Sequence, residues 1–174
     1  VQVLLRMRSE ESDGPLESLL GTRVSRTEWM LSYVINAVLG SIALLLLMSL
    51  GIGIGAGLTL GDLGKWLTDL LAAGLVQAPA VFVVGAIVVL LFAFLPRRAA
   101  ALSWAVFILA LLAGPMFGET IRLPDAIMDL SPFTHTPRMP VAPFEAAPVL
   151  VMLAIAVLLT AFGFGRFRQR DLAL

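Results

Sequence analysis

One stripe of polar and small side chains stands out within the longest charge-free stretch of the sequence. Ser32, Asn36 and Gly40 are spaced i, i+4 and i+8, and Tyr33 lies beside them. On a helix this spacing places the residues on one face. Hydroxyl and amide groups donate and accept hydrogen bonds without carrying a charge. The stripe therefore predicts either the lining of a pathway or a hydrogen-bonded contact with a neighbouring helix.

Residues for acid–base, nucleophilic or metal chemistry are missing from the apolar stretches. No Asp, Glu, Lys, Arg or His interrupts these stretches, and the sequence has no Cys, so proton relays, ion-coupled carriers and Ser–His or Cys catalysis lack their groups. The single histidine, His135, shares a proline-rich segment with Asp125, Asp129 and Glu145. One histidine with irregularly spaced carboxylates is weak evidence for a metal site. We predict neither catalytic nor metal-binding residues, and no cofactor on this chain.

The glycine-rich run from Gly51 to Gly61 does not have the spacing of a nucleotide-binding loop. It contains no G-x-G-x-x-G and no following GK[ST], and it continues an apolar segment instead of closing a strand. Its glycines instead form three G-x-x-x-G pairs, a pattern that permits close approach of two membrane helices. The pairs are Gly51/Gly55, Gly53/Gly57 and Gly57/Gly61.

The composition indicates that lipid surrounds most of the chain. Of the 174 residues, 59% are hydrophobic and 14% charged, and the mean hydropathy is +0.97. A helix needs roughly 20 apolar residues to cross the hydrocarbon core. We predict an all-α membrane protein with a transmembrane domain over 29–167. Its four transmembrane helices lie at about 29–50, 78–95, 99–117 and 146–165, with outer loops at 51–77 and 118–145.

The distribution of basic residues predicts the orientation. The N-terminal segment, the turn at Pro96–Arg98 and the C-terminal tail hold nine of the 12 Lys and Arg residues, whereas the two outer loops hold Lys65, Arg122 and Arg138. Because Lys and Arg collect on the cytoplasmic side, we expect both termini, including the tail 168–174, in the cytoplasm. Trp29, Trp66 and Phe167 lie where aromatic residues of the membrane interface are expected. The net charge of zero gives no footprint for nucleic acid.

The second outer loop is rich in proline, which removes backbone donors and blocks long helices. We expect it to form a rigid extracellular cap with one short helix from Pro124 to Leu130. Its prolines are Pro124, Pro132, Pro137, Pro140 and Pro143.

The cytoplasmic segment 1–28 predicts a short helix at 15–20 just before the first span. Gly14 and Pro15 suit its start, Gly21 suits its end, and Leu16, Leu19 and Leu20 form an apolar ridge at i, i+3 and i+4. Isolated helices below about 12–15 residues are marginal in water. We therefore expect this ridge to dock on a partner, or alternatively to lie in the lipid headgroups or on its own bundle.

The same segment resembles the E-x-x-G-x-x-E-x-L-L-x-T-x-V-S-R signature of permease subunits of type-2 ABC exporters. The stretch from Leu130 to Pro137 and the terminal Arg-Phe-Arg-Gln-Arg-Asp are similar to the C-terminal part of actinobacterial exporters of polyketide antibiotics. Gly21 and Pro15 depart from the residues common in the signature. The matching and neighbouring residues that we expect to dock are Glu10, Glu11, Gly14, Leu16, Glu17, Leu19, Leu20, Arg23 and Arg26.

The resemblance implies a transport role in a bacterial plasma membrane. It implies that the segment 15–20 is a coupling helix docked on a cytoplasmic ATP-binding subunit, in two copies, which carries ATP and Mg²⁺. Because such permeases have six or twelve spans and the chain starts at Val1, it also implies an upstream permease part or a second permease as partner. The alternative is a non-transporting membrane scaffold, which the scarcity of polar pathway residues favours. A membrane-embedded enzyme is disfavoured because catalytic groups are missing.

Overall fold

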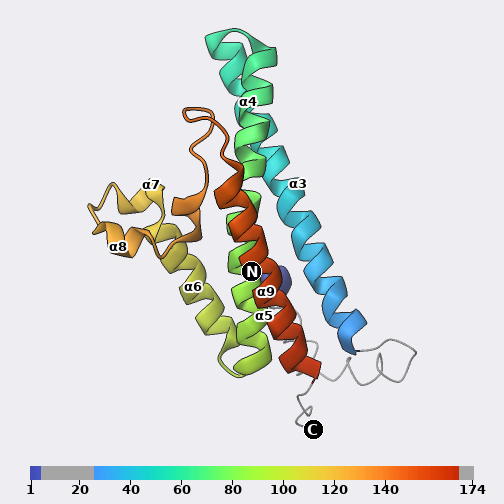
Figure 1. Ribbon diagram of the computed structural model, residues 1–174. Helices are drawn as coiled ribbons and strands as arrows, with labels where there is room; N and C mark the ends of the chain where they lie inside the picture. The colour runs from blue at the N-terminus through green and yellow to red at the C-terminus, as the bar shows by residue number, and fades with distance from the viewer. Residues whose placement is uncertain (5–25, 169–174) are drawn as a thin grey trace.

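The protein is an all-α membrane protein, as the composition predicts (Figure 1). The computed structural model describes residues 1–4 and 26–168, and in these ranges it contains helices and no strand. Residues 2–4 are helical. The elements that follow are α3 (Arg26–Leu60), α4 (Leu63–Val76), α5 (Ala78–Phe94), α6 (Ala99–Ala113), α7 (Pro115–Gly118), α8 (Asp125–Met128), the 3-10 helix η1 (Pro132–His135) and α9 (Ala146–Arg168).

Three described helical stretches are long and apolar enough to cross a membrane. They cover Glu28–Leu60, Leu63–Phe94 and Ala146–Arg168. The third predicted span, 99–117, is shorter than expected, because α6 has 15 residues and ends at Ala113. Gly114 adopts an extended backbone there, and the next residue is a proline, which has no N–H to continue the helix. The chain resumes as the short helix α7.

Residues 51–77, which we predict to form an outer loop, are almost entirely helical. The first predicted span does not end at Leu50: α3 continues to Leu60, and α4 then returns along it. The turn between them uses two left-handed residues, Gly61 at φ 81° and Asp62 at φ 56°. Asp62 also caps α4, since its Oδ1 accepts a hydrogen bond from the backbone N–H of Lys65 at 3.2 Å.

Glycine permits the close contact between α3 and α4. A Cβ added to Gly57 would lie 2.7 Å from the Cα of Leu63, and one added to Gly53 would lie 3.3 Å from the Cα of Leu67. Gly51 and Gly55 have no atom within 4 Å of such a Cβ. Of these glycines, only the Gly53/Gly57 pair therefore faces the partner helix. The close packing against α4 that this pair permits stabilises the glycine-rich segment as a helix.

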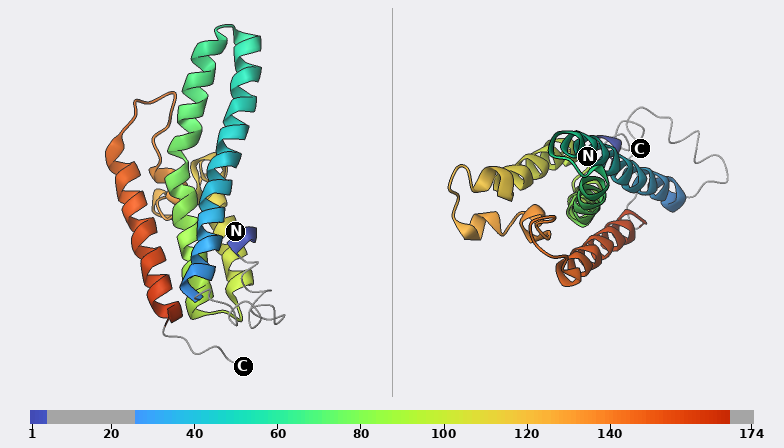
Figure 2. Two further views of the ribbon diagram at one scale, coloured as in Figure 1. Left: turned by 90° about the vertical axis from the view of Figure 1, so that its right-hand side faces the viewer. Right: turned by 90° about the horizontal axis from the view of Figure 1, so that it is seen from above.

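The helix α5 lies at the centre of the bundle, with α3, α6 and α9 around it (Figure 2). It packs most extensively against α9. Gly163 allows this approach, because a Cβ at that position would lie 2.9 Å from Cγ1 of Val89. One buried cluster on α5 and α9 contains Ala80, Val83, Ala86, Met152 and Ala156.

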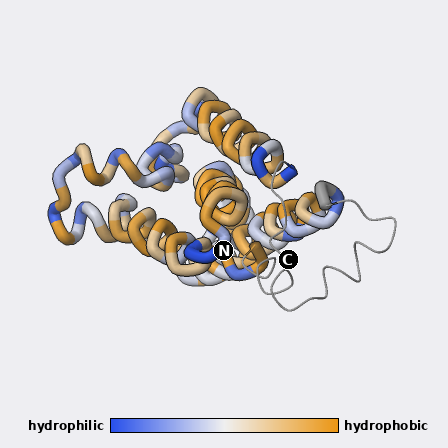
Figure 3. The backbone as a smooth tube through the Cα atoms, turned by 90° about the horizontal axis from the view of Figure 1, so that it is seen from below, coloured by the Kyte–Doolittle hydropathy of each residue, from blue (hydrophilic) through white to orange (hydrophobic). Residues whose placement is uncertain are grey.

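Hydrophilic residues gather at the helix ends and in the connecting segments, whereas the helices themselves are mostly hydrophobic (Figure 3). The start of α3, the turn between α5 and α6, and the end of α9 lie at the same end of the bundle (Figure 1). We call this the basal end. Arg97, Arg98, Arg166 and Arg168 are at this end.

The segment 119–145, here called the cap, folds back against the other side of the bundle. Its short helix α8 covers Asp125–Met128, which is shorter than the predicted Pro124–Leu130. The following helix η1 contacts α5, α6 and α9. The cap therefore has an ordered path over the helices, built from two short helical elements.

Candidate functional site

The polar stripe on α3 faces away from the rest of the described chain except at Tyr33, which packs against buried residues at the basal end. Ser32, Asn36 and Gly40 are exposed, and Tyr33 is half-buried. The hydroxyl of Ser32 donates to the carbonyl oxygen of Trp29 on its own helix, at 2.7 Å. A Cβ on Gly40 would have no atom within 4 Å. The spacing groups these residues on one helix face, but spacing alone does not predict which face of α3 packs against α5.

An apolar cavity of about 490 Å³ opens instead beside the neighbouring face of α3. Its wall on α3 includes Leu31, Val34 and Val38, and none of the four stripe residues belongs to the lining. The prediction that the stripe lines a pathway therefore receives no support from this cavity. The other walls are formed mainly by α5 and α9, with Phe107 from α6 and Phe133 from η1.

The cavity lining contains two side-chain hydroxyls and no charged side chain. Ser41 of α3 and Thr160 of α9 supply the hydroxyls. The Ser41 hydroxyl donates to the carbonyl oxygen of Ala37 at 2.5 Å, so its proton is already engaged. A wall of this composition suits an uncharged, lipophilic molecule, because a charged group would lose its hydration without gaining a partner.

A cluster of aromatic and aliphatic side chains closes the basal end of the bundle. The ring of Phe167 on α9 lies 6.3 Å from the Trp29 ring on α3 and 5.7 Å from the Phe92 ring on α5, measured between centroids. Trp29 and Phe167, which we expected at the membrane interface, are buried here, with 6% and 2% of their surface exposed. This basal cluster consists of Leu4, Trp29, Met30, Val88, Val89, Phe92, Ala93, Ala99 and Phe167.

The basal cluster holds both ends of the segment that carries the predicted docking residues. Leu4 precedes residues 5–25 and is 3% exposed, while Trp29 and Met30 follow them closely. Arg26 is the first residue of α3. The other predicted docking residues lie outside the described part of the chain: Glu10, Glu11, Gly14, Leu16, Glu17, Leu19, Leu20 and Arg23.

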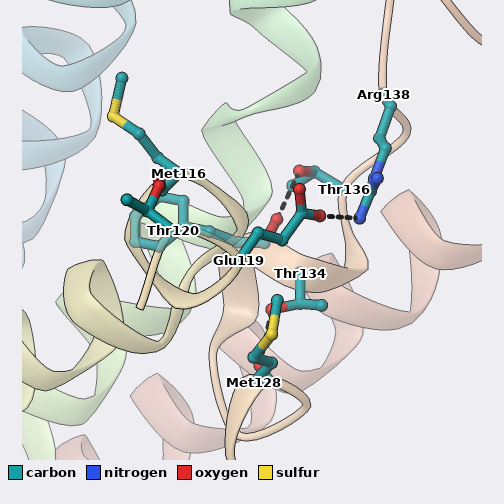
Figure 4. A network of polar contacts seen from close by, with 8 residues as sticks. Met116, Glu119, Thr120, Met128, Thr134, Thr136 and Arg138 are labelled. Carbon is teal, nitrogen blue, oxygen red and sulfur yellow. Dashed lines mark hydrogen bonds and ion pairs between the residues drawn. The ribbon is translucent and has the colours of Figure 1, made fainter. Parts of the chain in front are cut away.

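Hydrogen bonds and one ion pair fix the cap. Ser131 is buried, and its hydroxyl donates to the carbonyl oxygen of Ala110 on α6 at 2.7 Å. The Thr136 hydroxyl lies 3.1 Å from Oε1 of Gln77, at the junction of α4 and α5. Arg138 pairs with Glu119 at 2.8 Å (Figure 4). These contacts join residues up to 59 positions apart, and local sequence patterns gave no signal for them.

The described residues contain no group of three His, Asp or Glu side chains that could hold a metal ion. Nδ1 of His135 lies 3.1 Å from the carbonyl oxygen of Ser131, within its own 3-10 turn. His135 therefore contacts the backbone of its own short helix. The site that remains is an apolar cavity between a cap and an aromatic base.

These features define a multi-pass, all-α membrane protein whose helices line an apolar cavity. Residues 1–168 match the family described as "Multidrug efflux system permease Rv1217c, C-terminal domain". The chain belongs to this family, and the predicted resemblance to exporter permeases is confirmed.

A relative in Mycobacterium tuberculosis (strain ATCC 25618 / H37Rv) carries the name multidrug efflux system permease protein Rv1217c. The two sequences are 35% identical over 171 residues, which cover 98% of this chain. The chain spans 31% of the length of that relative.

Proposed function

We propose that the chain is a membrane-spanning part of an ATP-driven exporter of hydrophobic drugs or antibiotics, of the type-2 ABC class. Membership of an efflux permease family supports this proposal. The cavity supports it as well, because a volume of about 490 Å³ lined without charged side chains suits a lipophilic substrate. The energy would come from a separate ATP-binding subunit, present in two copies and carrying ATP and Mg²⁺.

The observation that carries the coupling proposal is the basal cluster. Leu4 and Trp29, on the two sides of residues 5–25, pack in one cluster with Phe92 of α5 and Phe167 of α9. A displacement of the docked segment would therefore act on helices that also form the cavity wall. Packed interfaces of this kind switch between discrete arrangements more readily than they deform continuously.

The proposed docking surface is the leucine ridge of the segment 15–20, which also contains Glu17. The acidic Glu10 and Glu11 precede this segment, and the basic Arg23 and Arg26 follow it. The basic residues at the basal end support a cytoplasmic position of this end in the bacterial plasma membrane. Both termini would then be cytoplasmic, and the cap would lie on the outer side. An upstream permease part or a second permease, together with lipid, would cover the exposed apolar faces.

Replacing Leu19 and Leu20 with Asp in the intact permease tests this proposal. If the ridge occupies an apolar groove, burial of each leucine contributes about 1.5–3 kcal/mol, and two buried unpaired carboxylates add a desolvation penalty. We expect the ATP-binding subunit to be lost during purification, with unchanged membrane insertion. A matched control replaces Ser12 and Ser18 with Asp, which adds the same charge outside the leucine ridge.

Co-purification of the ATP-binding subunit is the measurement. Loss from the leucine variant and retention by the serine variant would support docking on the ridge. Retention by both variants would contradict it and favour a ridge that lies in the lipid headgroups. If the wild-type permease carries no ATP-binding subunit at all, the non-transporting scaffold becomes the better account.

A further inference from the structure

Phe133 is the residue of the cap that reaches the apolar cavity. It lines the cavity together with residues of α3, α5, α6 and α9. It also packs on the buried cluster that includes Ala80 near the start of α5 and Met152 near the start of α9. Both helix starts lie opposite the basal end. Phe133 therefore lines the cavity at the end that lies farthest from the basal cluster.

A buried serine holds Phe133 in this position. Ser131 is 1% exposed, and its Oγ both donates to the carbonyl oxygen of Ala110 and accepts from the backbone N–H of Phe133, at 2.7 and 3.3 Å. The contact anchors the start of η1 to the last turn of α6. It is shielded from solvent, which strengthens a hydrogen bond relative to the same bond in water.

Two further contacts hold the chain after η1, and we call them the latch: Thr136 with Gln77 and Arg138 with Glu119. The Thr136 hydroxyl lies 3.1 Å from Oε1 of Gln77 and 2.9 Å from the carbonyl oxygen of Phe133. Arg138 pairs with Glu119 at 2.8 Å. Figure 4 shows the Arg138 side chain directed at the Glu119 carboxylate, with Thr136 close by. The Thr136 contact thus ties the chain after Phe133 to the junction of α4 and α5, and the ion pair ties it to Glu119, the first residue of the cap.

We propose that Phe133 is the outer stopper of the substrate cavity and that the latch keeps it closed. The inference rests on the proposed function, because it gives the cavity an exit through the cap. Opening would break the latch and swing the ring of Phe133 outward, while the Ser131 contact with Ala110 stays intact and acts as the hinge.

The strengths of these contacts support this division of roles. Arg138 and Glu119 have 65% and 54% of their side-chain surfaces exposed, and exposed ion pairs contribute little. The bond between Thr136 and Gln77 joins two neutral groups, and such bonds add a modest net stabilisation. Thr136 is itself 6% exposed, but its partner Gln77 is only half-buried, whereas the Ser131 contact is buried on both sides. Water reaches the latch more easily than the hinge and can replace its hydrogen bonds, so we expect the latch to open first.

A disulfide across the latch tests the proposal, because the chain has no cysteine of its own. Gln77→Cys and Thr136→Cys are combined in the intact transport system, in a cysteine-free background. The readouts are disulfide formation, measured by gel mobility, and ATP-dependent efflux of Nile red, an uncharged lipophilic dye. We expect the oxidised pair to lower the efflux rate at least tenfold and the reductant to restore it. Each single cysteine variant is the control for oxidation itself.

A second variant separates the stopper from general damage to the cap. Phe133→Ala in the oxidised double-cysteine protein should recover part of the efflux, because it removes the ring that fills the exit. Met139→Ala, a change elsewhere in the cap that touches no cavity wall, is the matched control and should recover none.

Each outcome decides the matter. Undiminished efflux from the oxidised pair would overturn the stopper, and so would equal recovery by Phe133→Ala and Met139→Ala. A bismaleimide that bridges the two cysteines locks the same pair without the Cα spacing that a disulfide requires, and undiminished efflux after bridging would overturn the proposal as well. Absence of ATP-dependent efflux from the wild-type system would instead reject the proposed export function. The reduced double variant carries no disulfide, so absence of efflux from it would point to the same conclusion without involving a locked latch.

Discussion

Residues of one type have different roles along α3, and glycine shows this most clearly. The sequence contains three overlapping G-x-x-x-G pairs, which by spacing alone are equivalent. The structure turns Gly53 and Gly57 toward α4, leaves Gly51 and Gly55 facing outward, and uses Gly61 for a turn with positive φ. Spacing predicts that close packing occurs, whereas the rotation of the helix about its axis is decided by contacts with a distant element.

The first prediction compares Gly57→Ala with Gly55→Ala. At Gly57 the new methyl group would lie 2.7 Å from the backbone of Leu63, so the two helices must separate. Overpacking of this kind costs about 1–3 kcal/mol. At Gly55 no atom lies within 4 Å, and replacing glycine inside a helix gains up to about 1 kcal/mol.

Unfolding of the purified protein in mixed micelles measures both effects. We expect Gly57→Ala to lower the free energy of unfolding and Gly55→Ala to leave it unchanged or raise it. Equal destabilisation by the two variants would mean that Gly55 also packs against a helix.

The helices illustrate which parts of an element the sequence defines. The starts of α5, α6 and α9 at residues 78, 99 and 146 coincide with the expected starts, because proline and charged residues bound the apolar runs there. The end of the first helix was misplaced, since 22 apolar residues are enough for one span and the following glycines weaken a helix. Contacts with α4 offset that weakness. These contacts join two separate elements, so the pattern of a single segment does not predict them.

The second prediction concerns the aromatic contact that joins α9 to α3 and α5. Phe167 is 2% exposed within the basal cluster, whereas Phe162 on the same helix is 67% exposed. Phe167→Ala would leave a cavity among Trp29, Phe92 and their neighbours, with a cost of up to about 3–5 kcal/mol. Phe162→Ala is the matched control, because it changes a mostly exposed side chain whose ring stacks on Phe94 outside the basal cluster.

Thermal unfolding in lipid nanodiscs is the measurement for this pair. We expect a clear loss of melting temperature for Phe167→Ala and a small change for Phe162→Ala. Similar melting temperatures for the two variants would show that the basal cluster does not stabilise the bundle, which would also remove the basis for coupling through it.

At the scale of the whole molecule, composition alone predicts an all-α membrane protein, and the structure agrees. The cavity and the cap contacts could not be predicted. They depend on pairs such as Thr136 and Gln77, which lie 59 residues apart in the sequence. Thr136 is in the proline-rich cap, and Gln77 is at the junction of α4 and α5. Periodicity describes one helix at a time, so it identifies the polar stripe of α3 but not the apolar face beside it that lines the cavity.

The third prediction concerns the orientation of the molecule. The turn at Arg97 and the cap are at opposite sides of the bundle, and Val141 in the cap is 94% exposed. In intact cells an impermeant thiol reagent should label Val141→Cys and Gly64→Cys, because both positions are on the proposed outer side. Arg97→Cys should react only after the cells are permeabilised, since basic residues collect in the cytoplasm. The reverse pattern would invert the orientation.

The most direct test of the account is a site-specific photocross-link from the proposed coupling segment. A benzophenone amino acid replaces Glu17 in the intact permease, and in a second variant it replaces Val141 at the opposite side as the control. The account predicts that irradiation joins position 17 to an ATP-binding subunit and that position 141 gives no such adduct. Adducts from position 17 that contain only lipid, or the same ATP-binding subunit attached at both positions, would contradict the claim that this segment couples ATP hydrolysis to the bundle.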